Sequence, residues 1–359
     1  MELQDIIALS RRYGSDPEAV LAGGGNTSAK DPHRMYIKCS GVQLATMDEA
    51  GFVPIDRHKM DVAMAQSYPA EDAAREAAFL QAVMATRALP GETRRPSVEA
   101  PLHNLFPQRL VLHVHPALIN GLTCSREGEA ACRRLFGDQV LWVPLCRPGY
   151  GLASLCREAM AHHKARTGRL PQILLLQNHG IFVAGDTPEE IDGLYAWVRD
   201  TLAKEVRQVP DLTPAGREVP RLTQLLKERC QMEYAAFSGG RDILALARSP
   251  QAAAPVLGAF TPDHIVYYGA APAYMEGPED LAALEQIPAG CRLVLVGGSG
   301  SYALGHTQKA ADTAALLFQD AVKIAVYSQA FGGYQHMTQE LTDFITHWEV
   351  ESYRKSQMK

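Results

Sequence analysis

Short apolar runs alternate with helix-like stretches along the first two-thirds of the chain, and this alternation constrains the fold more than any other feature. The runs have the length and composition of buried strands; in order they are RMYIKCSG, FVPID, LVLHVHP, QVLWVPL, QILLLQNHG and GIFVAG. Helical patterns cover the N-terminal residues and then Pro69–Thr86, Val98–Leu105, Ala117–Ser125, Leu152–Thr167 and Pro188–Val206. Because strands and helices lack a regular βαβ spacing, the pattern predicts an α/β or α+β sandwich.

A polar, proline-bearing stretch at Val209–Leu222 predicts a domain boundary. Residues 1–210 would form the larger domain, and residues 223–359 a smaller α+β unit. The smaller unit is expected to hold a strand at HIVYYG and a β-hairpin at CRLVLVGGSGSYALG, where two apolar runs flank a glycine-rich turn. Its expected helices are Thr223–Ala235, Gly240–Ser249 and Thr307–Ala330. We identify no internal repeat in the sequence.

The composition limits the partners and the compartment. The net charge of −5 and the lack of a Lys/Arg stripe argue against nucleic-acid binding, so a small molecule or a protein is the expected partner. Seven scattered cysteines without a CxxC pair indicate reduced thiols in a cytoplasm. The N-terminus lacks a signal-peptide pattern, and no apolar run reaches membrane-spanning length. We therefore expect a cytoplasmic protein that does not bind a membrane.

The strand LVLHVHP carries two imidazoles one residue apart. Successive side chains of a strand point to opposite faces, so His113 and His115 share a face. Two imidazoles fill an apolar core poorly but supply two ligands of a metal site; two satisfied or exposed histidines at a strand end are the alternative. His179, which follows the buried run QILLL, adds a third. Three histidine ligands with an open fourth position are typical of catalytic zinc, although cobalt, manganese or iron would also bind.

Glu99 in RPSVEAPLHNLF lies at an expected helix start and is a candidate base close to the metal, with a helix-dipole acid as the alternative. For His103, one turn later, we favour a packed or surface histidine. The stretch Ala22–Lys30 reads as a glycine-rich loop, and Ile37–Gly41 as a second one. Glycine N–H groups and short hydroxyls can hold a phosphate, although a flexible turn is the commoner explanation. The pair His162–His163 is expected to face solvent.

Taken together, the ordered segments GGGNTS, IKCSG, PSVEAPLH, HVHP and NHG resemble the class II aldolase/adducin family over about Arg11 to Val206. The resemblance implies an α/β/α sandwich around a mainly antiparallel sheet and a homotetramer. The segments SGVQLATM, GFVPID, FTPDHIV and VLVGGSGSYALG are similar to the aldolase part of long rhamnulose-1-phosphate aldolase/alcohol dehydrogenase proteins. In those proteins a dehydrogenase domain follows, and we expect this chain to lack it.

The resemblance also implies roles for individual residues. His113, His115 and His179 would bind a divalent metal, with Zn²⁺ as the expected ion, and Glu99 would be the acid/base. Positions that would bind the substrate or its phosphate are Gly25, Asn26, Thr27, Ser40, Gly41 and Ser97. The family often has SSE where this chain reads SVE, so Val98 replaces a phosphate-binding hydroxyl. The implied reaction is cleavage of a ketose 1-phosphate; the alternatives are epimerisation, dehydration or decarboxylation, or a non-catalytic adducin-like interaction protein.

Overall fold

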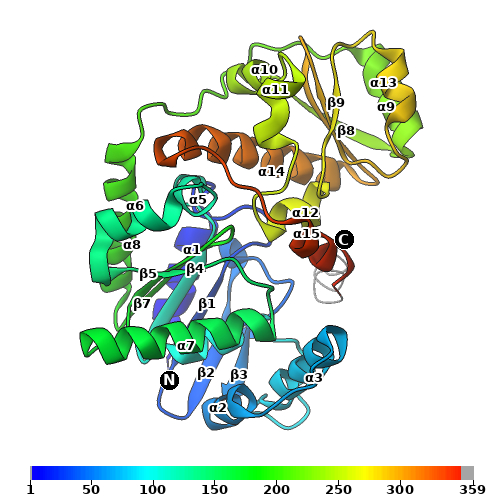
Figure 1. Ribbon diagram of the computed structural model, residues 1–359. Helices are drawn as coiled ribbons and strands as arrows, with labels where there is room; N and C mark the ends of the chain where they lie inside the picture. Colours follow the sequence, from blue (N-terminus) through cyan, green and yellow to red (C-terminus); the bar gives the residue numbers. More distant parts are fainter. Residues whose placement is uncertain (1, 349–359) are drawn as a thin grey trace. The chain divides into compact units, whose positions relative to one another are not determined.

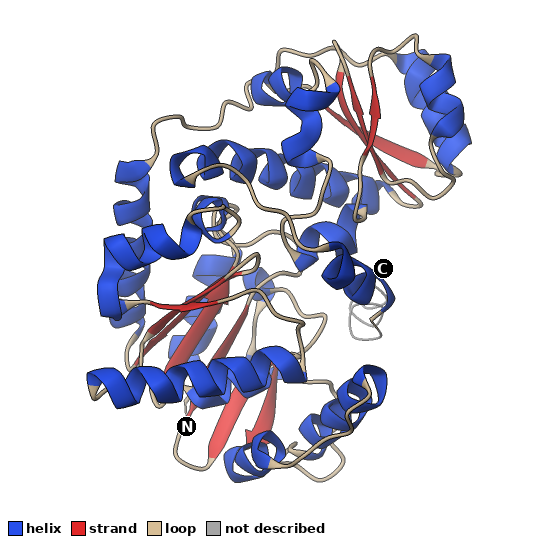
Figure 2. Ribbon diagram, viewed as in Figure 1, coloured by secondary structure: helices blue, strands red, loops and turns tan. Residues whose placement is uncertain are grey.

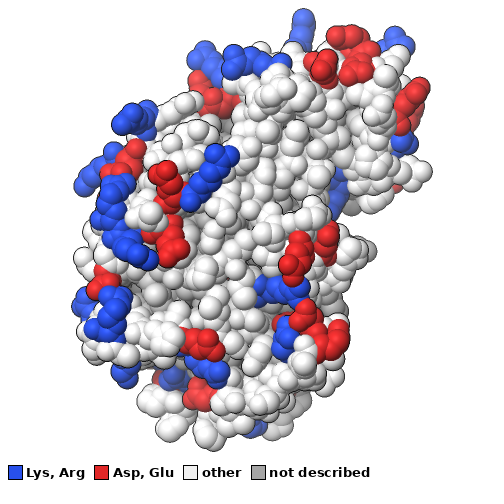
Figure 3. Space-filling model, in the orientation of Figure 1, with Lys and Arg blue, Asp and Glu red and all other residues white. Residues whose placement is uncertain are grey.

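The computed structural model describes residues 2–348, which form two compact units (Figure 1). Among the described residues, the first unit comprises 2–119 and 129–202, and the second comprises 120–128 and 203–348. No described helix combines the length and the apolar character that crossing a membrane requires. On the face drawn in Figure 3, basic and acidic side chains are interspersed.

A seven-stranded sheet forms the centre of the first unit, with the order β3-β2-β1-β4-β7-β6-β5. Neighbouring strands are antiparallel except for β5 and β6, which are parallel. The bounds are β1 Asn26–Lys30, β2 Arg34–Lys38, β3 Phe52–Asp56, β4 Leu110–Val114, β5 Leu141–Val143, β6 Ile173–Leu176 and β7 Gly180–Gly185. The unit is therefore built around a mainly antiparallel sheet, as the family resemblance implied.

Helices cover both faces of this sheet (Figure 2). One face packs on α2 (Arg57–Ala65), α3 (Asp72–Ala85), α4 (Ala100–Leu105) and α7 (Tyr150–Thr167), which share a single apolar core with it. On the other face lie α1 (Gln4–Gly14) and α8 (Pro188–Glu205), whose Tyr13 and Tyr195 rings meet at 5.1 Å. The unit also contains the start of α5 (Ala117–Thr123) and all but the first residue of α6 (Gly128–Phe136). The layers form an α/β/α sandwich, which confirms the predicted fold class.

The stretch Ala22–Lys30 corrects one expectation for this unit. The sequence predicts a loop there, but residues 26–30 form the central strand β1, which pairs with β2 and β4. All five of its residues are buried. Their polar side chains are compatible with burial because hydrogen bonds satisfy them; Ser28, for example, bonds to His103 at 2.8 Å. Tertiary partners rather than strand propensity therefore decide the conformation.

The second unit contains a four-stranded sheet with the order β8-β11-β10-β9. Its strands are β8 Tyr234–Ser238, β9 Ala273–Met275, β10 Leu293–Val296 and β11 Gly300–Gly305. Its helices are α9 Pro220–Cys230, α10 Arg241–Leu246, α11 Pro250–Ala253, α12 Pro262–Tyr268, α13 Leu281–Gln286, α14 Gln308–Tyr327 and α15 Gln339–His347. The predicted hairpin is present as β10 and β11.

The predicted strand at HIVYYG is wrong, because residues 264–268 of this segment lie in helix α12. Thr261 is the N-cap, Pro262 occupies the first turn, and the side chains of Thr261 and His264 complete a capping box. These are strong helix-start signals, and they outweigh the β-branched run that follows them. An apolar run of this length does not separate the two structures by itself.

The structure contains an internal repeat, contrary to our reading of the sequence. Adding 120 to the residue numbers of the β6–β7 hairpin gives the bounds of β10 and β11. The strand pairs match as well, because β4–β7 and β8–β11 are antiparallel while β5–β6 and β9–β10 are parallel. Turn residues Asn178 and Gly298 both have positive φ, 54° and 70°. The second sheet therefore copies the β4-β7-β6-β5 half of the first.

Backbone hydrogen bonds outside the strand ladders also recur in the two units. In the first unit Gln177 N donates to Val143 O at 3.0 Å, and in the second Gly297 N donates to Met275 O at 2.9 Å. The turn bonds His179 N to Leu176 O and Ser299 N to Val296 O are both 3.2 Å long. The repeat therefore extends to the backbone geometry of the turn that carries His179.

The repeat predicts how the second turn tolerates substitution. Gly298→Asn should cost less than about 1 kcal/mol, because asparagine tolerates a left-handed conformation and occupies the equivalent position 178. Gly300→Ala should cost about 2 kcal/mol or more, because its Cβ would lie 2.5 Å from Ser238 O and its φ is +149°. Urea unfolding midpoints of the two variants and the wild type measure the difference; equal losses would contradict the prediction.

Candidate metal centre

Three histidine side chains of the first unit converge on one point. His113 lies in β4, His115 follows that strand directly, and His179 lies in the turn between β6 and β7. One ligand nitrogen from each ring lies within 4.8 Å of the other two. The Nε2 atoms of His113 and His115 are 2.9 Å apart. The structure thus brings together the three residues that the sequence suggested as metal ligands.

The surroundings of His113 orient its ring for metal binding. The ring is fully buried and stacks on Phe182 of β7 at 4.0 Å between centroids. Its Nδ1 lies 2.9 Å from Ile181 O and donates to it, which leaves the Nε2 lone pair directed at the cluster. Burial lowers the pKa of His113 to about 4, so the ring is neutral near pH 7. Three imidazole rings whose nitrogens converge on one point fit a divalent transition metal.

Glu99 lies against these nitrogens, at the residue that precedes α4. Its Oε1 is 3.2 Å from Nε2 of His113 and 3.1 Å from Nε2 of His179. Burial by itself raises the pKa of Glu99, but the positive charge that His113 and His179 carry in their protonated forms outweighs it and holds the pKa well below its ordinary value. The site therefore presents a carboxylate next to the three nitrogens.

A chain of hydrogen bonds holds the other carboxylate oxygen. Asn26 Nδ2 donates to Glu99 Oε2 at 2.5 Å, and Asn26 Oδ1 accepts from His103 Nε2. His103 Nδ1 then accepts from the Ser28 hydroxyl at 2.8 Å. His103 is fully buried, so it is a packed histidine as the sequence favoured. Its link to Glu99 was missed, although the four-residue spacing of Glu99 and His103 places both on one side of α4.

Five of the six predicted substrate positions fall into two groups. Gly25 and Asn26 lie beside the histidines; a Cβ on Gly25, whose φ is +66°, would lie 2.8 Å from His113 O, so only glycine fits there. Ser40, Gly41 and Ser97 belong to a second group, because Ser40 N donates to Arg95 O at 2.8 Å and Ser97 N to Lys38 O at 2.9 Å. This second group joins Glu99 through the Ser97 hydroxyl, which accepts from Glu99 N at 3.4 Å.

Thr27 points away from both groups. Its hydroxyl lies 2.7 Å from that of Ser10 in α1, and its side chain is fully buried. Alternation along β1 places Asn26 and Ser28 on the face of Glu99 and Thr27 on the opposite face. A substrate role for the Thr27 side chain stays a prediction that this geometry does not support.

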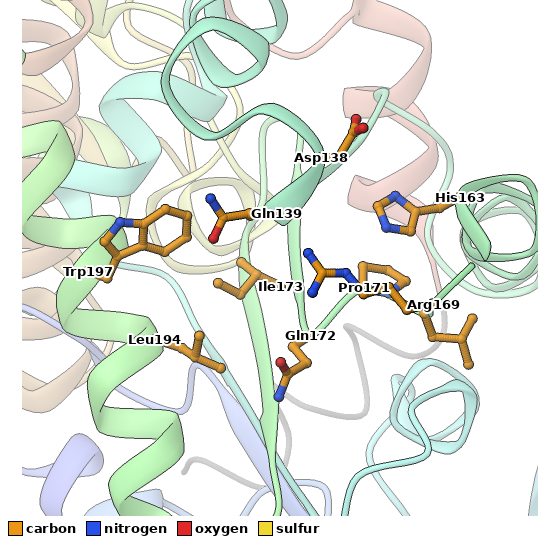
Figure 4. A pocket seen from close by; sticks show the side chains of 10 residues that line it. Asp138, Gln139, His163, Arg169, Pro171, Gln172, Ile173, Leu194 and Trp197 are labelled. Atoms are coloured by element: carbon orange, nitrogen blue, oxygen red, sulfur yellow. The ribbon is translucent and has the colours of Figure 1, made fainter. Parts of the chain in front are cut away.

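The adjacent pair His162–His163 corrects a further expectation. His162 is exposed, but His163 is only 4% exposed and lines a small polar cavity with Asp138, Arg169 and Trp197 (Figure 4). The helical spacing gives the reason: His163 follows the buried residues Cys156 and Met160 by seven and three positions, so it shares their face of α7. That spacing was present in the sequence and was overlooked.

Comparison with known proteins establishes the family. A family model described as the Class II Aldolase and Adducin N-terminal domain matches residues 4–203. The chain belongs to this family. A curated relative from Bacillus subtilis (strain 168), named "Uncharacterized oxidoreductase YuxG", is 23% identical over 411 residues. The alignment covers 98% of this chain but 58% of that relative, so the chain spans little more than half of its length.

Solved structures of class II aldolase domains are similar to part of this member of the family. The N-terminal class II aldolase domain of a Thermoplasma acidophilum protein is 25% identical, with a TM-score of 0.48, covering 57% of this chain and 93% of that one. The L-fuculose-1-phosphate aldolase of Thermus thermophilus is 18% identical, with a TM-score of 0.36, covering 56% and 94%. YgbL of Escherichia coli, titled a putative aldolase/epimerase/decarboxylase, is 18% identical, with a TM-score of 0.38, covering 56% and 86%.

The contact between Thr27 and Ser10 leads to a test that separates stability from site chemistry. Thr27→Val removes one buried hydrogen bond and should lower the free energy of unfolding by about 1 kcal/mol. It should leave the metal content of the protein unchanged, because the side chain faces α1. Thr27→Ser keeps the hydroxyl and is the matched control. Loss of metal from the valine variant alone, measured by elemental analysis, would contradict this separation.

Proposed function

We propose that this class II aldolase family member is a metal-dependent aldehyde-lyase. Its substrate would be a ketose 1-phosphate of the rhamnulose or fuculose type, and its products dihydroxyacetone phosphate and an aldehyde. The observation that carries the proposal is the convergence of three imidazole nitrogens and the Glu99 carboxylate on one point. Family membership supports the reaction class, and the residues supply the acid/base chemistry that it needs.

The donor set suits a divalent metal, for which we propose Zn²⁺. His113, His115 and His179 would hold it, and three nitrogen donors leave an open position for substrate oxygens. When bound, such a metal stabilises the negative charge that develops on an enediolate. The hydrogen bond from His113 to Ile181 O fixes the tautomer that this role requires.

Glu99 would move the proton. Its carboxylate is ionised beside the cluster, so it can accept a proton from a substrate hydroxyl or carbon. Asn26 holds Oε2 and leaves Oε1 facing the histidines, so the reactive oxygen has a fixed position. His103 and Ser28 orient Asn26 in turn. The chain thus positions the base before the substrate binds.

The two groups of residues would bind the substrate phosphate through hydroxyls and through backbone N–H groups other than those of Ser40 and Ser97, which bond to carbonyls of this chain. Binding energy from a remote phosphate positions the carbons that react. Gly41 has a φ of +88° next to Ser40, a turn conformation that presents backbone groups for such a contact. We also propose a homotetrameric assembly of the enzyme, in line with the family resemblance.

Metal content is the first test of the proposed site. Elemental analysis of the wild type should give about one zinc per chain, and His113→Ala should lose it, because one of three ligands is removed. His162→Ala, which removes an exposed histidine, should keep the wild-type content. A protein that retains no stoichiometric metal under any loading condition would overturn the proposal and favour a non-catalytic adducin-like role.

Activity tests the role of Glu99. In the metal-loaded enzyme, Glu99→Gln should lower kcat for ketose 1-phosphate cleavage by about 10²–10⁴-fold, because the amide cannot accept the proton. Metal content should remain, and Glu189→Gln at the exposed start of α8 should match the wild type. The measurement is the release of dihydroxyacetone phosphate from a panel of ketose 1-phosphates. Epimerised or decarboxylated products instead of cleavage would assign a different reaction to the same site.

A further inference from the structure

The outer edge of strand β8 carries backbone groups that no described residue binds. β8 ends its sheet and pairs only with β11. Leu304 N donates across to Arg292 O, next to β10, so the residues on either side of Leu304 turn their backbone groups toward β8. In the register of β8 and β11, the N–H and C=O groups of Ala235 and Phe237 then point away from the sheet.

The internal repeat shows what the equivalent edge does elsewhere in this chain. Strand β4 corresponds to β8, with Val111 and His113 at the positions of Ala235 and Phe237. In the first unit this edge of β4 pairs with β1. The sheet of the second unit has no described counterpart of β1. Therefore the second unit retains a pairing edge without its strand.

The connecting segment before α9 closes only one end of this edge. Ala215 N and Gly216 N donate to Gly239 O at 2.8 and 2.7 Å. Gly239 is the next outward-facing residue after Phe237, so the segment covers the sheet edge there and no further. The open part of the β8 edge is therefore short, and the backbone groups of Ala235 and Phe237 lie at its centre.

Two large apolar side chains flank the open edge. Tyr234 of β8 is 44% exposed and Leu316 of α14 is 48% exposed. The side chain of Gln319 donates to Ser238 Oγ at 2.9 Å, and Leu316 lies one helical turn before Gln319, so it projects from the same side of α14. Tyr234 and Ser238 lie on one face of β8, so the side chains of Tyr234 and Leu316 lie on the same face of the sheet, beside its open edge.

We propose that the edge of β8 pairs with β8 of a second copy of this chain. The two β8 strands would run antiparallel, related by a twofold axis that passes between the two Ala236 residues. The two sheets would form one eight-stranded sheet. Ala235 would then lie opposite Phe237 of the partner subunit, and the outward backbone groups of both residues would bond across the axis. The pairing goes beyond the proposed reaction and does not depend on it.

A second copy fits the edge for two reasons. The outward-facing residues lie symmetrically on either side of Ala236, so the strand is complementary to itself in the antiparallel direction. The strand YAAFS carries no charge, whereas edge strands that avoid self-pairing commonly carry charged residues or proline. Any other occupant would have to supply a strand from outside residues 2–348.

Cross-linking tests the register. At the twofold axis, two Ala236 residues would form a non-hydrogen-bonded pair with Cα atoms about 4.5 Å apart, a separation that a disulfide can span. Ala236→Cys should therefore give a covalent dimer on a non-reducing gel after mild oxidation of the full chain. Ala235→Cys would face Phe237 of the partner subunit and should give no more dimer than the wild type, which controls for the seven native cysteines.

Light scattering tests the edge itself. Ala235→Pro removes the outward N–H of residue 235 and leaves every N–H that bonds to β11. The pairing should therefore be lost while the fold persists, and the particle mass should fall by half. Ala235→Val keeps the N–H and should have the wild-type mass; circular dichroism confirms that both variants are folded. Absence of the cross-link in Ala236→Cys, equal cross-linking of the two cysteine variants, or a proline variant of wild-type mass would each overturn the proposal. Metal content and lyase activity remain separate readouts of the first unit.

Discussion

The pairing of β4 with β7 is the interaction on which the candidate site depends. It sets Phe182 beside His113, so that the imidazole stacks on the phenyl ring at 4.0 Å and its Nδ1 reaches the carbonyl of Ile181. The same ladder fixes the turn before β7, which carries His179. A shift of one residue would turn His113 to the opposite face and separate the ligands. The register of β4 against β7 therefore determines whether the histidines of this unit can form one site.

Much of the scaffold and the three histidines could be predicted from the sequence, because buried strands leave a local signature. The apolar runs at LVLHV, ILLL and GIFVAG correspond to β4, β6 and β7. Strand β1 could not be found in this way, since NTSAK is polar and its burial depends on partners such as Ser10 and His103, which are distant in the sequence. The Asn26–His103 link was hidden for the same reason. In contrast, the cap at Thr261 and the helical spacing of His163 were readable and were underweighted.

The repeat separates what the scaffold needs from what the chemistry needs. At the positions of His113, His115 and His179 the second unit has Phe237, Gly239 and Ser299. It nevertheless keeps the strand order, the positive φ in the turn and the turn hydrogen bonds. The side chains differ while the backbone pattern is the same, so the repeat leaves little trace in the sequence. The imidazoles are therefore not required for this β-hairpin to form, and the fold alone does not specify a function.

The hydrogen-bond chain through Asn26 has a consequence for proton exchange at Glu99. The amide hydrogen that Asn26 donates to Oε2 occupies one of the two lone pairs of that oxygen. A proton on that lone pair would require the amide to reverse, and His103 and Ser28 would then have to exchange their donor and acceptor roles as well. Oε1 meets no such barrier. The two oxygens of one carboxylate are thereby made inequivalent: Oε2 is an anchor in the hydrogen-bond chain, and Oε1 faces the histidines outside that chain.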